Sequence, residues 1–339
     1  MGYDRLARHF SRCDQPTVTT LPDGSVDYYC SVTGGTGDLL DTRDALADEL
    51  LGDRTSIEYV VETTEPGGQA VNAAKQLHAL GGDVTCYGHL DSPVFDATSF
   101  ETVSMGDPAL VYVFTFSDRD VMFVNNSGVT DWTLDDLRRE RSLSAVFDSD
   151  VVCCSNWLSL SGLEDAFYQL AEEDLPRIPF VFDPGDIVGN SHDEIDALHD
   201  ALAALQNTFD VVYNANRAEV RTTTAPFEET FEDDIDRLAA IRAETGITAA
   251  AMHARDEAAV VSSDERTSVD NYHVTKPARH TGGGDRFTGG LGYALACDWD
   301  WESGLACGNA CATYYVETGE TATVDDIVTL VEEHRPAER

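Results

Sequence analysis

The chain has 339 residues, of which 42% are hydrophobic, so it is long enough to bury the core of one α/β domain spanning residues 1–339. Its 22 lysine and arginine residues stand against 62 aspartate and glutamate residues, a formal net charge of −40 that is spread along the whole length. This charge argues against nucleic acid and anionic membranes as partners, and it is typical of a cytoplasmic protein adapted to concentrated salt.

The composition argues against several other classes of protein. Residues 1–12 lack the apolar core of a signal peptide, and no window approaches the roughly 18 apolar residues of a membrane span. The eight cysteines form no CxxC pair and most lie in apolar runs, so we expect buried free thiols rather than zinc ligands or disulfides. The nine histidines show no metal-binding spacing. Lysine is scarce, with only Lys75 and Lys276 in the chain.

Along the chain, short apolar runs alternate with helical periodicity from about residue 66 onward, which predicts βαβ units and a doubly wound, mainly parallel sheet flanked by helices. Residues 25–62 and 109–124 interrupt this rhythm and are predicted to form antiparallel strands of a small β lid. The predicted buried strands are 84–87, 145–147, 151–153, 180–182 and 211–213. The predicted helices are 71–80, 162–172, 195–205 and 229–244.

The first glycine motif is the Gly67-Gly68 pair, which precedes a predicted helix that carries Gln69 and Asn72 on its first turn. Polar donors and close backbone approach suit recognition of a sugar hydroxyl. Helix capping by the Gly-Gly turn is the alternative interpretation.

The second glycine motif is Gly282-Gly283-Gly284, which leads into Asp285 where another amphipathic helix is predicted to begin. Glycines let backbone N–H groups converge on an anion, and the positive end of the helix adds to the attraction. A carboxylate at this position can take a proton from an attacking hydroxyl. The alternative is a flexible turn capped by Asp285.

Together these motifs resemble those of the ribokinase-like (PfkB-type) carbohydrate and nucleoside kinases, and the resemblance extends from about Gly24 to Ile327. The amino-terminal signature of the family appears as Gly67-Gly68, Asn72 and Leu80-Gly81. The carboxy-terminal signature appears as residues 279–290. The resemblance implies a ribokinase-like fold, with Asp285 as the catalytic base and the turn from Gly282 to Gly284 as the anion hole.

The resemblance also implies further site residues. Asn216 and Glu219 match an Asn-x-x-Glu element that holds Mg²⁺ and phosphate through water, although a helix amino-terminus capped by Asn is the default interpretation of that pattern. Asp27 matches the residue that binds the hydroxyls of the acceptor sugar, with a surface turn as the alternative. The residues expected beside the nucleotide are Asn216, Glu219, Asp183, His253 and Asn309.

The chain departs from the family pattern at three places. Arg279 replaces the Asp that supports a monovalent-cation site in many relatives, which argues against potassium dependence. His253 lies in a segment that replaces the usual Thr-x-Gly, so the donor nucleotide, ATP or ADP, stays open. Arg286 follows the catalytic Asp, where it is expected either to meet a phosphate or to neutralise nearby carboxylates.

The implied reaction is Mg²⁺-dependent phosphoryl transfer from ATP to a hydroxyl of a small sugar-containing acceptor. A sugar, a nucleoside and a sugar phosphate are all open; Gln69 argues against ribokinase itself, and a lid arginine, Arg119, makes ribose 1-phosphate a specific candidate. A sensor of the same fold that binds a nucleotide or sugar without catalysis is the alternative. A homodimer through the lid is compatible with the family.

Overall fold

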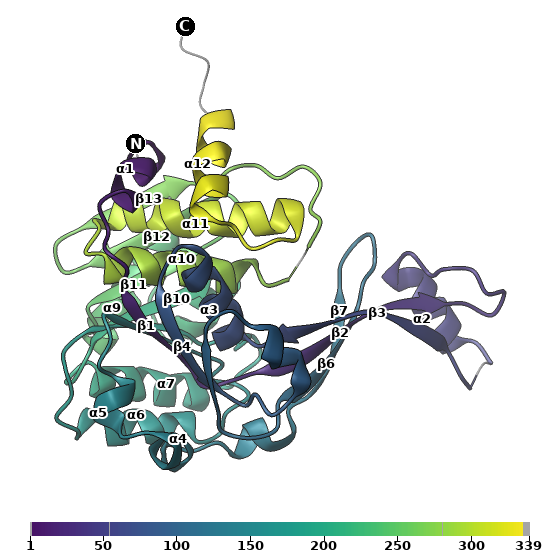
Figure 1. Ribbon diagram of the computed structural model, residues 1–339, viewed down its shortest axis with the longest axis horizontal. Coiled ribbons are helices and arrows are strands. Elements are labelled where there is room, and N and C mark those ends of the chain that lie inside the picture. Colours follow the sequence, from purple (N-terminus) through teal and green to yellow (C-terminus); the bar gives the residue numbers. More distant parts are fainter. Residues whose placement is uncertain (1, 54, 280, 335–339) are drawn as a thin grey trace, which may run out of the picture.

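The computed structural model describes residues 2–53, 55–279 and 281–334, and its elements are labelled in Figure 1. The strands are β1 (Thr17–Leu21), β2 (Ser25–Thr33), β3 (Glu58–Gly67), β4 (Asp83–Gly88), β5 (Glu101–Ser104), β6 (Ala109–Phe114), β7 (Val121–Asn125), β8 (Val151–Ser155), β9 (Pro179–Asp183), β10 (Asp210–Asn216), β11 (Ala249–His253), β12 (Glu257–Ser262) and β13 (Arg266–Asp270). The α-helices are α1 (Leu6–Phe10), α2 (Arg43–Leu51), α3 (Gln69–Ala79), α4 (Leu134–Glu140), α5 (Leu143–Val146), α6 (Leu163–Ala171), α7 (His192–Leu205), α8 (Arg217–Thr223), α9 (Asp234–Thr245), α10 (Gly283–Ala296), α11 (Trp301–Thr318) and α12 (Val324–Glu333). Three 3₁₀ helices lie at Tyr3–Arg5, Pro93–Ala97 and Ser127–Asp131 in the part of the chain that the structure describes.

The larger sheet orders its strands β13-β12-β11-β10-β9-β8-β1-β4-β5. The pairs from β5 across to β11 are parallel, and β12 and β13 add an antiparallel edge. Parallel strands need helical crossovers, and the apolar runs of β8, β9 and β10 are buried because helices cover both faces. The predicted doubly wound, mainly parallel α/β fold is therefore confirmed.

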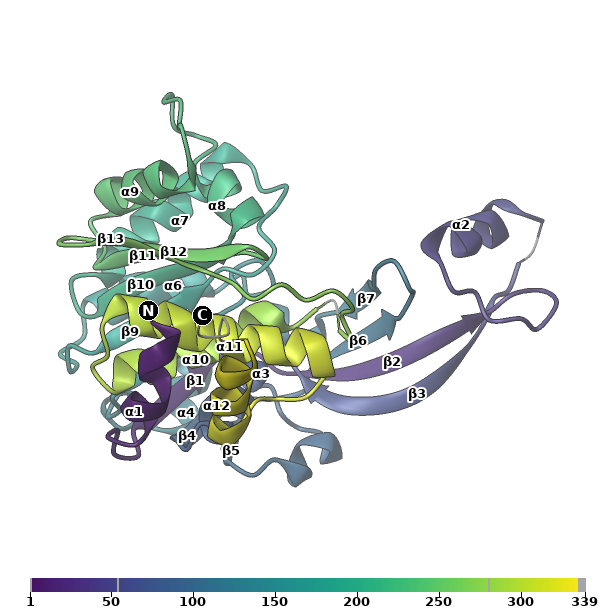
Figure 2. The same ribbon diagram turned by 90° about the horizontal axis from the view of Figure 1, so that it is seen from above.

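Helices α3, α10, α11 and α12 cover one face of this sheet, and α6, α7 and α9 cover the other (Figures 1 and 2). Each layer has its own apolar core. Leu77, Phe287 and Leu305 belong to the first core, whereas Phe167 and Leu202 belong to the second, and all five side chains are fully buried. No helix among the described residues is long and apolar enough to cross a membrane.

The smaller sheet has the strand order β3-β2-β6-β7 and projects from the body of the molecule. Strands β2 and β3 are antiparallel, β2 and β6 are parallel, and β6 and β7 form a hairpin. Helix α2, which lies between β2 and β3 in the sequence, sits at the outer end of these strands (Figure 2) and buries none of its side chains. Residues 25–62 thus contain a helix as well as the expected strands.

Two expectations were wrong. Residues 145–147 are not a strand: the chain makes the helical turn α5, which buries Leu143 and Val146 on one face before β8 begins.

The cysteines are not all free either, because Cys13 and Cys297 form a disulfide across 284 residues of sequence. Six cysteines are buried free thiols, namely Cys30, Cys86, Cys153, Cys154, Cys307 and Cys311.

Candidate active site

The polar residues singled out in the sequence gather at the carboxyl ends of the parallel strands. Asp183 ends β9, Asn216 ends β10 and His253 ends β11, while Asp27 lies on β2 soon after β1. In open α/β sheets this edge is where ligands bind. A cleft of about 1290 Å³ opens here between the larger and the smaller sheet, and all of these residues line it.

The glycine turn before α10 has the backbone geometry of an anion site. Gly282 adopts the left-handed conformation, with φ of 83°, and caps a helix whose first turn holds Gly283 and Gly284. The first N–H groups of a helix have no intrahelical acceptor, so they are available to a ligand. A Cβ atom on Gly284 would lie 2.8 Å from Nε2 of His253, which leaves room only for glycine.

Asp285 lies in this first turn and faces the cleft. Its Oδ2 accepts a hydrogen bond of 2.9 Å from Nδ2 of Asn72 on α3, so the two signatures of the sequence meet in space. Burial raises the pKa of Asp285, whereas the Asn72 hydrogen bond and the Arg286 charge lower it. The carboxylate is thus a stronger base than an exposed aspartate, with partners that favour its ionised form.

The Gly67-Gly68 turn lies beside Gly24 and beside Asp27, the residue expected to meet the acceptor. Gly68 has φ of +99°, and a Cβ atom there would lie 2.8 Å from the Cα of Gly24. The Asp27 carboxylate packs directly on Gly67 and accepts a hydrogen bond of 2.6 Å from the Ser25 hydroxyl. Burial raises the pKa of Asp27 to about 6, against the opposing effects of Ser25 and a nearby ammonium group on Lys75.

Asp23 is a site residue that the sequence did not reveal. Its buried carboxylate accepts hydrogen bonds from the backbone N–H groups of Gln69 (3.0 Å) and Ala70 (2.7 Å), and from Nδ2 of Asn156 (3.0 Å). It therefore caps α3 from 46 residues away and fixes the helix that carries Asn72. No local pattern in the sequence singles out Asp23, because its contacts join segments that lie 46 residues apart.

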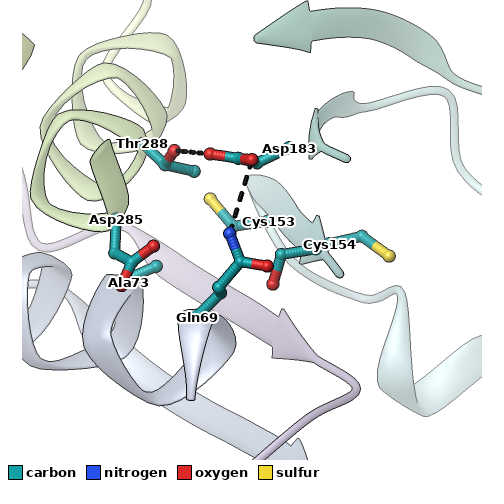
Figure 3. Close-up of a pocket in the computed structure, with 8 residues that line it drawn as sticks. Gln69, Ala73, Cys153, Cys154, Asp183, Asp285 and Thr288 are labelled. Atoms are coloured by element: carbon teal, nitrogen blue, oxygen red, sulfur yellow. Dashed lines mark hydrogen bonds between the residues drawn. The ribbon is translucent and has the colours of Figure 1, made fainter. Parts of the chain in front are cut away.

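A further buried carboxylate, Asp183, lies close to Asp285. Asp183 accepts from the backbone N–H of Gly185 (3.0 Å), the Thr288 hydroxyl (3.1 Å) and Nε2 of Gln69 (3.5 Å), as Figure 3 shows for the two side chains. Burial and the Asp285 charge raise the pKa of Asp183 to about 7. Burial and the Asp183 charge raise the pKa of Glu219 to about 8.

Asn216 and Glu219 form a capping box at the start of α8. The Asn216 side chain accepts from the N–H groups of Ala218 (2.9 Å) and Glu219 (3.1 Å), and the Glu219 carboxylate accepts from the backbone N–H of Asn216 (2.7 Å). The capping interpretation of this motif is therefore correct, and both residues still line the cleft. The described residues contain no cluster of three or more metal-ligating side chains. Carboxylates whose mutual repulsion raises their pKa values fit Mg²⁺ held through water and phosphate oxygens rather than in a protein cage.

His253 is held by a chain of hydrogen bonds. Nδ2 of Asn214 donates to the Thr288 hydroxyl (2.8 Å), which leaves the Asn214 oxygen to accept from Nδ1 of His253 (3.2 Å). The imidazole stacks on Phe287 at 5.0 Å, and burial lowers its pKa to about 4, so it is neutral. With the hydrogen on Nδ1, the unprotonated Nε2 faces Gly284.

The arginines singled out in the sequence occupy different environments. Arg119 is exposed on the β6–β7 turn and lines the cleft. Arg279 also lines the cleft, but its guanidinium pairs with Glu65 at 3.0 Å and stacks on Tyr29 at 3.9 Å. Arg286 is only 3% exposed; it donates to the Asn72 carbonyl at 2.8 Å and lies over the Tyr315 ring, away from the cleft wall.

Asn309 is buried in α11 and also lines the cleft, about where a nucleotide base is expected. Its Nδ2 donates to the carbonyl of Val269 at 3.2 Å, which ties α11 to β13. Gln69, Asn72, Gly68 and the three glycines before Asp285 line the same cleft. Arg286 and Gly67 are the two predicted site residues that do not reach its wall.

Solved structures share this architecture. A structure of phosphofructokinase-2 from Escherichia coli, in complex with substrates and products, superposes with a TM-score of 0.70 at 16% identity, covering 94% of this chain and 99% of that one. Ribokinase from Thermotoga maritima gives 0.67 at 13% identity over 94% and 99% of the two chains. A nucleoside kinase from Methanocaldococcus jannaschii gives 0.66 at 15% identity over 95% and 100%. These similarities show the fold.

The sequence comparisons identify the family. A ketohexokinase from Haloferax volcanii is 26% identical over 289 residues, which cover 80% of this chain and 76% of that protein. The family model for prokaryotic ketohexokinases matches residues 37–334, which include both glycine turns and Asp285. The chain therefore belongs to the prokaryotic ketohexokinase family, within the ribokinase-like carbohydrate kinases.

Proposed function

We propose that the protein transfers the γ-phosphoryl group of ATP to a hydroxyl of a free ketohexose, in a reaction that requires Mg²⁺. The observation that carries this proposal is the position of Asp285: at the start of α10, bonded to Asn72 and open to the cleft that Asp27 also lines. Family membership supports a ketohexose as the acceptor class.

In the proposed reaction, Asp285 accepts the proton of the attacking hydroxyl. Its raised pKa makes it a better base, and Asn72 orients the carboxylate by holding Oδ2. Asp27 and Asn72 would bind other hydroxyls of the acceptor, and Gly67 and Gly68 let the sugar approach the backbone closely.

The N–H groups at the start of α10, from Gly282 to Asp285, would stabilise negative charge on the transferring group. Glu219 and Asn216 would hold Mg²⁺ through water, and the ion supplies neutralisation of phosphate charge when bound. Asp183 and His253 border the phosphate region, and Asn309 borders the base. Arg279 places a fixed positive charge where many relatives have an acid, so we propose no potassium site.

The arginines favour an uncharged acceptor. Arg279 is already paired with Glu65, and Arg286 is buried against Asn72 and Tyr315. A phosphate on the acceptor, as in ribose 1-phosphate, would have Arg119 as its principal candidate partner among the three. One exposed arginine is a weak phosphate site compared with a bidentate cluster.

The smaller sheet is proposed to act as a lid over the acceptor, formed by about residues 25–62 and 109–124, and as a dimer interface. Its outer strands expose apolar side chains to 41–58% of their full areas, an unusual density for an acid-rich protein. They are Tyr59, Val60 and Val61 on β3, and Met122, Phe123 and Val124 on β7. Light scattering of the wild type and of Phe123→Lys tests the dimer: a monomeric wild type would refute it.

A panel of sugars, nucleosides and ribose 1-phosphate, assayed by ADP release in high potassium chloride, tests the function. We expect Mg²⁺-dependent turnover with ketohexoses and little with ribose 1-phosphate. The remaining alternative is a cytoplasmic sensor of the same fold. Tight binding of sugar or nucleotide without turnover would favour that sensor and overturn the kinase proposal.

A further inference from the structure

Lysine is almost absent from this chain, yet one of its two lysines lies beside the candidate acceptor site. Lys276 is exposed on a loop, whereas Lys75 is partly buried on α3, one turn beyond Asn72. Because the chain has only two lysines, a lysine that is partly buried needs an explanation. Burying an ammonium group is costly unless its surroundings use the charge.

Lys75 bridges two segments that build the acceptor site. Its Nζ donates a hydrogen bond to the carbonyl of Pro66, the residue immediately before the Gly67-Gly68 turn. This contact ties the end of β3, at the base of the smaller sheet, to α3. Lys75 does not line the cleft, so a direct contact with the sugar is not its role.

Lys75 is surrounded by charged groups from three neighbouring elements. Asp27 on β2, Glu65 on β3 and Asp285 on α10 face it with negative charge, and Arg286 on α10 faces it with positive charge. Glu65 already pairs with Arg279, and Asp285 has Arg286 and Asn72 beside it. Against the effect of burial, the charge of Lys75 lowers the pKa of Asp27, whereas the charges of Asp285 and Asp23 raise it.

The expected protonation states of Lys75 and Asp27 agree with a charge interaction between them. Burial and, to a smaller extent, the Arg286 charge lower the pKa of Lys75 to about 8, although the three carboxylates act in the opposite direction. The ammonium group is therefore still mostly charged at neutral pH. Without it, burial and two neighbouring carboxylates would push the pKa of Asp27 above its present value of about 6.

We propose that Lys75 is a positioning residue for the acceptor: it anchors the Gly67-Gly68 turn to α3 and supplies the positive charge facing Asp27, which then meets the sugar as a carboxylate. This inference rests on the proposed function for the identity of the sugar. It assigns a role to a residue that lies outside the cleft and acts through Asp27.

The first test needs no turnover. The carboxyl titration of Asp27 is followed by ¹³C NMR in the wild type, Lys75→Met and Lys75→Arg, with Asp27→Asn to assign the signal and Lys276→Met as the matched control. We expect the Asp27 midpoint to rise by about one pH unit in Lys75→Met and to stay near the wild-type value in the other two lysine variants. An unchanged midpoint in Lys75→Met overturns the proposal.

The second test is kinetic and uses whichever acceptor the wild type phosphorylates, so the sugar assignment can fail while this inference survives. We expect Lys75→Met to raise the KM for the acceptor about tenfold at pH 5, below the Asp27 midpoint, and only about twofold at pH 7, with the KM for ATP unchanged within about twofold at pH 5. Lys75→Arg should restore most of the loss. Equal losses on both substrates, with Lys75→Arg as poor as Lys75→Met, would indicate a merely structural role. If Lys75→Met does not fold, as judged by thermal unfolding, Lys75→Gln takes its place.

Discussion

Replacing Gly284 by alanine is the most direct test of the proposed anion hole at the start of α10. The new Cβ would lie 2.8 Å from Nε2 of His253, closer than such atoms approach in proteins. The imidazole cannot easily swing away, because it is stacked on buried Phe287 and bonded to Asn214. The first turn of α10 must therefore shift by several tenths of an ångström. This shift moves at least one backbone N–H group away from the position proposed for the transferred phosphoryl group.

Loss of one such donor costs on the order of 100-fold to 1000-fold in turnover, or about 3 to 4 kcal/mol. We expect Gly284→Ala to lower kcat by about 100-fold, with little change in the KM for the sugar. Gly283→Ala is the matched comparison, since its Cβ would meet only the Val316 side chain at 3.1 Å. For Gly283→Ala we expect a smaller loss of kcat, within about tenfold, because the Val316 methyl group can move.

The assay is steady-state ADP release, combined with thermal unfolding of each variant. His253→Ala in the Gly284→Ala background should recover at least tenfold of the lost kcat, because it removes the atom that the methyl group meets. The double-mutant cycle then gives a coupling free energy above about 1 kcal/mol. Equal losses in the two glycine variants, or a coupling near zero, would refute the steric argument.

Three further predictions follow from the same geometry. Asp285→Asn should reduce kcat by about 100-fold or more while calorimetry shows nucleotide affinity retained, and an undiminished rate would remove Asp285 from the role of base. Because burial raises the pKa of Asp27 to about 6, kcat/KM for the sugar should rise with pH through that value as the carboxylate ionises, and Asp27→Asn should abolish this limb of the profile. Lowering the potassium chloride concentration should lower the unfolding temperature steeply, because a net charge of −40 repels itself when unscreened; a melting temperature independent of salt would contradict adaptation to a saline cytoplasm.

The sequence was sufficient for the parts of the site that depend on local backbone geometry. The turn before Asp285 and the turn before Asn72 are glycine-rich because their backbones are left-handed or crowded. Glycine can be recognised in the sequence, so both turns could be predicted from it. Asn216 was equally readable, since its capping box spans only four residues. The meeting of Asn72 with Asp285 was implied by the family resemblance alone.

Three of the missed features depend on contacts between distant segments. Asp23 caps a helix that begins 46 residues later, so no local sequence pattern reveals the contact. The disulfide joins Cys13 to the end of α10, where the amino-terminal segment happens to pack. The charge of Arg286 suggested that it could bind a phosphate. The face of α10 on which it lies, however, packs against Asn72 and Tyr315. Periodicity reports which face is buried, but not what it is buried against.

The residues that line the cleft come from two separate parts of the chain, one in each sheet layer. Asp27, Val111 and Arg119 reach the cleft from the strands and the hairpin turn of the smaller sheet, whereas Asp285 on α10, Asp183 on β9 and Glu219 on α8 reach it from the larger sheet and its helices. If the proposed roles hold, substitutions in the strands of the smaller sheet should alter which alcohol is selected while the residues proposed for phosphoryl transfer stay in place. Such modularity gives evolution, or an engineer, a route to new substrate preferences that does not begin by sacrificing catalysis.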